Sequence, residues 1–199
     1  IESGSPLDYI FLPHFKAVPS QSKKLNSEVC PVVQSETYYL RSAFNEKIEA
    51  LKKDGVQLLT PVIDLAKELH ARKNALIDTA VQILGVQRSR ARKAFQKAIA
   101  RQEQCLNELK AIGAKALTAL EKDTNQMAVV ILGRPYNSFV DEAHMGIPHK
   151  IASRGIMVMP LDFLPLEDEQ TKRHMYWGMG QLVIKAARFV KKHPQLFAT

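Results

Sequence analysis

A short apolar run that stops at a glycine and a proline constrains the fold more than any other feature. Residues 127–132 read Met-Ala-Val-Val-Ile-Leu, and Gly133-Arg-Pro-Tyr-Asn137 follows directly. A run of this length, rich in β-branched residues and closed by Gly and Pro, is typical of a strand buried in a parallel sheet. Ligands of such sheets bind beyond the carboxyl ends of the strands, so this segment is a candidate binding loop. The same residues also suit an ordinary turn.

A second apolar run, residues 156–160, follows one short helix later. Residues 146–154 are typical of that helix, and Gly155 can end it. A right-handed crossover makes the two strands parallel and brings the loop that contains Arg134 and the loop 161–165 to the same edge of the sheet. The sequence therefore predicts an α/β fold with a Rossmann-like or flavodoxin-like parallel sheet.

The residues before this unit predict a strand followed mainly by helices. A strand is predicted at 8–13, ended by Pro13, and apolar spacing predicts a helix over 32–51. Thr60-Pro61 is a typical helix start, so a helix is predicted from there to Leu84, with Gly85 ending it. A second helix, 89–122, completes a predicted helical hairpin.

These elements predict a domain division with a helical insertion. Residues 1–59 and 123–199 are assigned to one sheet domain, and 60–122 to the helical-hairpin insertion. The C-terminal residues predict a helix over 171–190 and then the start of a strand at 195–199. The sheet domain is therefore expected to be incomplete at its C-terminus.

Composition narrows the classes of protein that fit. The apolar fraction of 46% is ordinary for a folded domain, and the first residues lack the order of a signal peptide. No run approaches the ~20 apolar residues that cross a bilayer, so a cytoplasmic protein without a membrane partner is expected. The sequence has no Cys-x-x-Cys or His-Glu-x-x-His motif, so no common zinc or iron–sulfur site is expected from this chain alone.

Asp141, His144 and His149 have no recognisable acid–base spacing, and the isolated chain is not expected to be an active enzyme.

Most of the net charge of +8 comes from one segment. Residues 88–122 contain nine Lys or Arg and three Asp or Glu. Such a segment could bind nucleic acid, but a charged long helix is usually a solvated face. A helix of over thirty residues also does not suit a helix-turn-helix reader, whose recognition helix is short. Nucleic acid is therefore an unlikely partner.

The two cysteines have different surroundings. Cys105 lies near the apolar stripe of the predicted helix 89–122, where a small buried apolar residue is expected. Cys30 follows a polar segment and precedes Pro31, so it is predicted at or next to a helix N-terminus. Backbone N–H groups and the helix dipole stabilise a thiolate there, which suits a nucleophile or a metal ligand. An ordinary cysteine close to a turn explains the same pattern.

Several stretches taken together resemble one family. They are Glu28-Val-Cys-Pro-Val-Val-Gln34, Leu132-Gly-Arg-Pro-Tyr-Asn137, Gly146-Ile-Pro148 and the segment from Met175 to Val190. In this order they resemble the central module of CoA-substrate-specific enzyme activases, the large activator-related proteins of the 2-hydroxyacyl-CoA dehydratase system. The resemblance covers nearly the whole chain.

The resemblance implies partners and a cofactor. It implies that the chain lies between an activase module, which uses ATP to drive low-potential electron transfer, and an iron–sulfur dehydratase-like module. It also implies that Cys30 ligates an iron–sulfur cluster in the full-length protein, while no cofactor is expected on this chain by itself.

The predicted ligand-binding residues are those of the loop with one histidine beyond it: Gly133, Arg134, Tyr136, Asn137 and His144. Asn137 stands where the family commonly has His, and His144 where it usually has Asn. The helix after Cys30-Pro31 also lacks a Pro that is common in the family. The alternative to a cluster-bearing module is a noncatalytic adapter that binds an anion or acyl-CoA, with Arg134 contacting a CoA phosphate.

Overall fold

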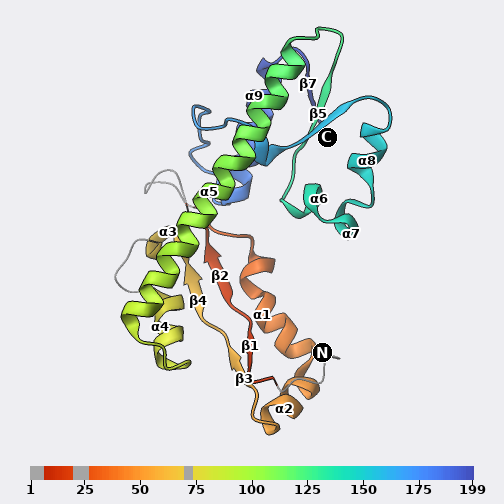
Figure 1. Ribbon diagram of the computed structural model, residues 1–199. Coiled ribbons are helices and arrows are strands. Elements are labelled where there is room, and N and C mark those ends of the chain that lie inside the picture. The colour runs from red at the N-terminus through yellow and green to blue at the C-terminus, as the bar shows by residue number, and fades with distance from the viewer. Residues whose placement is uncertain (1–6, 20–26, 70–73) are drawn as a thin grey trace. The chain divides into compact units, whose positions relative to one another are not determined.

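The computed structural model describes residues 7–19, 27–69 and 74–199 (Figure 1). Contacts within the chain group it into two compact units, Ile1–Lys97 and Ala98–Thr199. The domain division made from the sequence stays a prediction. The described elements are a mixture of helices and short parallel strands, which confirms the α/β fold class.

The first unit contains two parallel strand pairs that follow each other. β1 (Tyr9–Phe11) pairs with β3 (Gln57–Leu59), and β2 (His14–Ala17) pairs with β4 (Val62–Asp64). Backbone hydrogen bonds continue through the break, since Leu12 N–H donates to the Leu59 carbonyl at 2.8 Å and His14 N–H to the Pro61 carbonyl at 2.9 Å. Pro13 and Pro61 have no N–H to contribute, which explains the interruption. The strand predicted at 8–13 is confirmed as β1.

The helix predicted over 32–51 is two helices. α1 (Pro31–Ala43) and α2 (Asn45–Lys53) meet at Phe44. α1 packs on β2 and carries one buried residue, Thr37, whose hydroxyl lies 3.1 Å and 3.0 Å from the carbonyls of Leu12 and Pro13. Apolar residues of the strands stay exposed in this unit, including Tyr9, Phe11, Phe15 and Val62.

The helix predicted from Thr60 to Leu84 is wrong. Residues 62–64 form β4, and the helices α3 (Leu65–Glu68) and α4 (Ala75–Gln82) follow. Val and Ile at positions 62 and 63 suit a strand, and parallel pairing with β2 outweighs the local Thr-Pro signal. Gly85 has a φ of +66° and ends this region in the left-handed conformation, as predicted. The predicted hairpin therefore has only the eight-residue α4 as its first arm.

The long helix predicted over 89–122 is confirmed as α5 (Arg88–Glu121). An ion pair of 2.7 Å between Arg88 and Asp78 links its start to α4. Its later residues belong to the second unit, where Leu117 and Leu120 enter the core. Among the helices of the described residues, none has the length and apolar content needed to cross a membrane.

The second unit is built on a three-stranded parallel sheet. β5 (Ala128–Ile131) lies in the centre, β6 (Met157–Pro160) on one side and β7 (Leu196–Ala198) on the other. Between β5 and β6 lie α6 (Tyr136–Phe139), α7 (Asp141–His144) and α8 (Ile147–Ala152); between β6 and β7 lie the 3-10 turn η1 (Leu161–Phe163) and α9 (Gly178–Lys192). The predicted parallel strands at 127–132 and 156–160 are confirmed, and the C-terminal strand is present.

The core of the second unit joins the sheet to α5 and α9. Figure 1 shows α9 and α6–α8 on different sides of the strands. The buried core residues include Leu120 of α5, Val130 of β5, Met159 of β6, Ala186 of α9 and Leu196 of β7. Burial of a strand from both sides explains why the sequence of β5 is almost continuously apolar.

Candidate functional site

The loop that follows β5 lies at a special point of the sheet. The strand order is β6–β5–β7, so the chain first crosses from β5 to one neighbour and then returns past β5 to the other. In open parallel sheets, ligands bind where such a reversal occurs, beyond the carboxyl ends of the strands. Leu132 N–H donates to the Thr199 carbonyl at 2.9 Å, which keeps the ends of β5 and β7 together. The loop Gly133–Asn137 follows the carboxyl end of β5, at this reversal.

Gly133 lies in close contact with one side chain of the loop. A Cβ atom at this glycine would lie 2.5 Å from Nδ2 and 3.2 Å from Cβ of Asn137. The Asn137 side chain thus occupies the space that any other residue at 133 would fill. Asn137 N–H also donates to the Arg134 carbonyl at 2.8 Å, so the loop closes into a tight turn.

Arg134 and Tyr136 place a positive charge beside an aromatic ring. The Arg134 guanidinium carbon lies 5.9 Å from the centre of the Tyr136 ring, which is within the range of a cation–π contact. Arg134 is half-buried, while Tyr136 is 45% exposed. The loop therefore presents a cation and an aromatic surface at the carboxyl edge of the sheet.

A second loop reaches the same edge. η1 directly follows β6, and the rings of Phe139 on α6 and Phe163 on η1 lie 6.2 Å apart. This contact confirms the prediction that the loops after the two strands share one edge. Partial burial raises the pKa of Asp162 on η1 above its ordinary value. The sequence predicts that Asp162 follows a strand, but it does not predict that the Asp162 side chain is partly buried.

His144 lies beyond the loop, at the end of α7. Its ring is buried, Nδ1 accepts a hydrogen bond from Gly146 N–H at 3.1 Å, and Nε2 lies 3.0 Å from Oδ1 of Asp141. The structure brings a third residue to this pair, His149, whose Nε2 lies 3.8 Å from the same Asp141 oxygen. In the sequence these three residues have no recognisable acid–base spacing, and only the fold brings them together.

Cys30 belongs to the first unit, where it occupies the N-cap position of α1. Pro31 follows at the first helical position, and Gln34 N–H donates to the Cys30 carbonyl at 3.1 Å. This confirms the predicted place at a helix N-terminus. Cys105 is half-buried on α5, and the two cysteines are not in disulfides. A four-cysteine iron–sulfur cluster needs more thiolates than the two cysteines of this chain, so these residues alone do not fit such a cluster.

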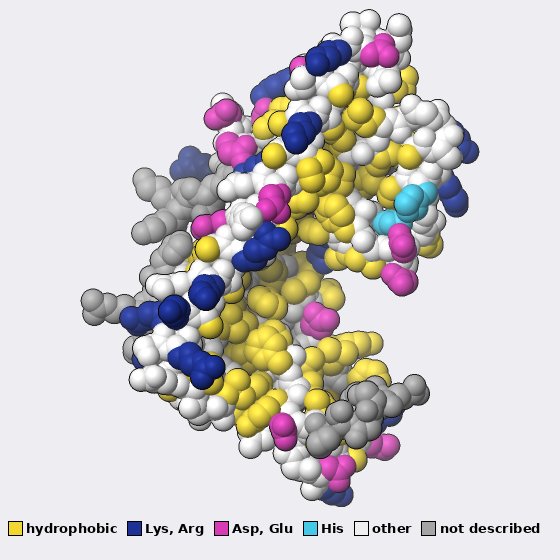
Figure 2. All heavy atoms as spheres, viewed as in Figure 1, with side chains coloured by type: hydrophobic (Ala, Val, Ile, Leu, Met, Phe, Trp, Pro, Cys, Tyr) yellow, Lys and Arg dark blue, Asp and Glu magenta, His cyan; other side chains and the backbone are white. Residues whose placement is uncertain are grey.

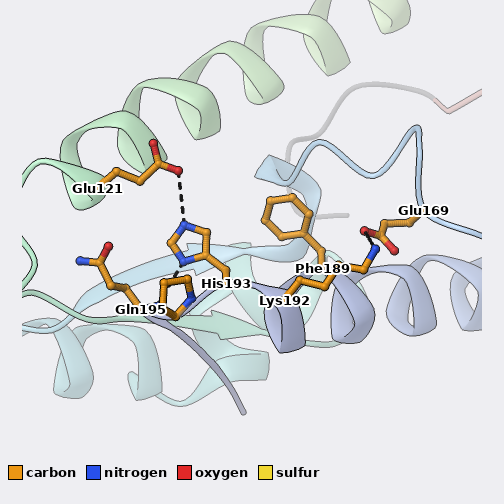
Figure 3. A pocket seen from close by; sticks show the side chains of 7 residues that line it. Glu121, Glu169, Phe189, Lys192, His193 and Gln195 are labelled. Atoms are coloured by element: carbon orange, nitrogen blue, oxygen red, sulfur yellow. Dashed lines mark hydrogen bonds and ion pairs between the residues drawn. The ribbon is translucent and has the colours of Figure 1, made fainter.

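A pocket lies at the opposite end of the sheet, next to the amino end of β7 (Figure 3). It is lined by Glu121, Glu169, Phe189, Lys192, His193, Pro194 and Gln195. Its polar groups face one another, with Lys192 2.6 Å from Glu169 and His193 3.4 Å from Glu121. The Gln195 amide donates to backbone carbonyls of residues 120, 123 and 126. These contacts join the end of α5 to β7 and serve the fold.

The fold and the loop define an α/β domain with a cationic turn at the carboxyl edge of a parallel sheet. A family model described as "CoA enzyme activase uncharacterised domain (DUF2229)" matches residues 3–164. The chain belongs to this CoA enzyme activase domain family. No curated protein and no solved structure matches the chain. The matched residues include Cys30, the Gly133–Asn137 loop and η1.

Proposed function

We propose that this chain is a ligand-binding domain of a CoA enzyme activase, and that the Gly133–Asn137 loop receives an anionic group of a CoA-type ligand. The observation that carries the proposal is the position of Arg134 directly after the central strand, where the crossovers reverse. Membership of a family described by CoA enzymes supports a CoA-type ligand. The domain binds and does not itself carry out a reaction.

The chemistry of the loop suits a phosphate. A guanidinium group is planar, always charged and able to donate two parallel hydrogen bonds to phosphate oxygens. Tyr136 lies beside this group and leaves nearly half of its surface exposed, so it can contact an apolar or aromatic part of the same ligand. Asn137 adds an amide that can donate and accept.

Thermal-shift titration tests this proposal. A ligand that binds only the folded state raises the unfolding midpoint by mass action. Coenzyme A and acetyl-CoA are titrated against the wild type, Arg134→Gln and the control Arg173→Gln, which removes an exposed cation elsewhere in the second unit. We expect a midpoint shift in the wild type and the control that Arg134→Gln loses. Absence of a shift in the wild type, or equal shifts in all three proteins, would contradict the proposal.

We propose a second role for Cys30, as one thiolate ligand of an iron–sulfur cluster that other segments of the full-length protein complete. Its N-cap position on the 13-residue α1 supports this, because the helix dipole there stabilises a thiolate. In this arrangement the parent protein uses ATP to deliver electrons to a 2-hydroxyacyl-CoA dehydratase. Iron content and visible absorbance of the full-length protein are compared between Cys30→Ala and Cys105→Ala. Loss in the first variant alone is expected, and equal iron in both variants would exclude Cys30 as a ligand.

A further inference from the structure

The segment after α6 gathers two histidines and an aspartate at the protein surface. Asp141 and His144 lie at the two ends of α7, and His149 lies on α8. One possible ligand atom from each residue lies within 4.8 Å of the others. Figure 2 shows histidine side chains beside acidic ones on the visible face of the molecule.

A sharp reversal of the backbone makes this arrangement. Met145 and Gly146 both adopt left-handed conformations, with φ values of 50° and 73°. Such a φ is uncommon for any residue with a side chain, so Met145 marks a turn that the surrounding structure holds in place. The turn ends α7 and starts α8 at once, and it returns His149 toward the face that carries Asp141 and His144.

One of the three residues is buried and the other two are exposed, as suits an open metal site. The His144 side chain is 5% exposed, whereas Asp141 and His149 are 84% and 78% exposed. The buried ring gives a fixed anchor, and the two exposed residues leave the site open to solvent. An ion held here would keep access to water or to a further ligand.

We propose that Asp141, His144 and His149 bind a divalent first-row transition ion of the Zn²⁺ type. Two imidazoles and one carboxylate suit such ions, whereas Mg²⁺ and Ca²⁺ prefer oxygen ligands alone. Ligands about 2.0–2.2 Å from a tetrahedral ion lie about 3.3–3.6 Å from one another. The distances from the Asp141 oxygen to the Nε2 atoms, 3.0 Å and 3.8 Å, lie on either side of this range. Three protein ligands leave one position for water or a ligand atom.

Binding has a defined consequence at His144. Nδ1 accepts from Gly146 N–H, so the neutral ring carries its proton on Nε2, facing Asp141. An ion needs the lone pair of Nε2. The proton must therefore move to Nδ1, and the hydrogen bond from Gly146 N–H must break. Metal binding is thus coupled to a change of tautomer and to a rearrangement of the turn.

The first experiment is equilibrium dialysis of the untagged 199-residue chain against Zn²⁺, followed by metal analysis, and the same with Co²⁺ to record its visible absorption. The variants are Asp141→Asn, His149→Ala and their combination, which alter exposed side chains and leave the core intact. The control is His174→Ala, an exposed histidine outside the cluster. We expect one ion per wild-type chain, a loss of affinity of at least about tenfold in each single variant, and no change in the control.

The second experiment measures which ring nitrogen of His144 carries the proton. In nuclear magnetic resonance spectra, Zn²⁺ should shift the Gly146 amide and convert the His144 ring from the Nε2–H to the Nδ1–H tautomer, and the double variant should show neither change. Equal Zn²⁺ retention by the wild type and the double variant would overturn the proposal. A tautomer that stays unchanged while the ion binds would also overturn it, because His144 would then not be a ligand.

Discussion

Replacement of Gly113 by Ala tests the packing that holds the carboxyl edge of the second unit. Gly113 is a buried residue within α5, and a Cβ atom there would lie 1.9 Å from the carbonyl oxygen of Phe163 and 2.7 Å from its carbonyl carbon. An ordinary contact begins at 3.4 Å, so the two backbones must separate by more than an ångström. Because Phe163 belongs to η1, the strain falls on the loop that carries Asp162.

Two opposing free energies decide the sign of this change. Ala in place of Gly in a helix interior stabilises by about 0.8–1 kcal/mol, and overpacking of a close contact costs about 1–3 kcal/mol, or more where backbone must move. The contact here is with backbone, so we expect the clash to win and the free energy of unfolding to fall by about 1–2 kcal/mol. In a chain of this size each kcal/mol lowers the melting temperature by about 2–4 °C.

A matched glycine in the same unit provides the control. A Cβ atom at Gly180 on α9 would also be too close, 2.6 Å, but to the sulfur of Met175, the far end of a flexible side chain. Gly180→Ala should therefore be close to neutral. Melting of both variants is followed by circular dichroism and by calorimetry. If Gly113→Ala were as stable as the wild type, the close approach of α5 and η1 would not hold in solution and this reasoning would be refuted.

Three further changes probe other parts of the fold. Asn74→Ala removes an N-cap whose buried side chain accepts from two backbone N–H groups of α4, and urea unfolding should show a loss of about 0.5–2 kcal/mol, whereas an unchanged midpoint would argue against the cap. Leu120→Ala opens the fully buried core of the second unit and should cost about 2–5 kcal/mol, measured by the same method; a loss below about 1 kcal/mol would contradict the burial. Asp162→Asn should stabilise the folded state at neutral pH. The raised pKa means that the folded state holds the Asp162 proton more tightly than the unfolded state does. The wild type therefore loses stability as the pH rises from the ordinary to the raised pKa, and the Asn variant does not. That gain should vanish at pH values below the ordinary aspartate pKa of 3.8, and a gain independent of pH would contradict it.

The parallel unit of β5 and β6 could be predicted from sequence because local and nonlocal signals agree there. A β-branched run that ends in Gly133 and Pro135 is a local signal for a strand, and burial on both faces requires the same apolar residues.

Residues 60–84 show the opposite case. Thr60 and Pro61 form a local helix signal, but the following residues pair with β2, more than forty positions earlier in the chain. Such distant pairing leaves no trace in a local window.

The C-terminal helix shows a second limit of local patterns. Its apolar spacing predicts a start at Thr171, but α9 starts only at Gly178. The buried Gln181 side chain accepts from Lys172 N–H at 2.8 Å and donates to the carbonyls of Lys172 at 2.7 Å and Met175 at 3.2 Å. These bonds hold the preceding residues in a turn instead of a helix, and a side chain that satisfies backbone groups nine residues away cannot be predicted from helical periodicity.

The candidate loop could be predicted from the sequence, but the cluster of Asp141, His144 and His149 could not. Arg134 follows a predicted strand, so the position of the loop follows from the sheet. The cluster depends on left-handed backbone at Met145, a residue type that rarely adopts it. The spacing of Asp141 and His144, three residues apart on a helix, was the one available signal.

We expect the two proposed sites on this segment to support each other electrostatically. A divalent ion bound by one carboxylate leaves the cluster with a net charge of +1, the same sign as Arg134, so an occupied cluster attracts the anionic group that the loop is proposed to bind. Two unit charges in water interact by about 1 kcal/mol at about 4 Å and by less at larger separations, so we expect at most about a fivefold change in affinity. Linkage requires that CoA strengthens Zn²⁺ binding by the same factor as Zn²⁺ strengthens CoA binding, and titration of each ligand in the presence of the other measures both. The segment from Gly133 to His149 would then act as one binding unit, with the anion at the Gly133–Asn137 loop and the cation at the turn of Met145 and Gly146.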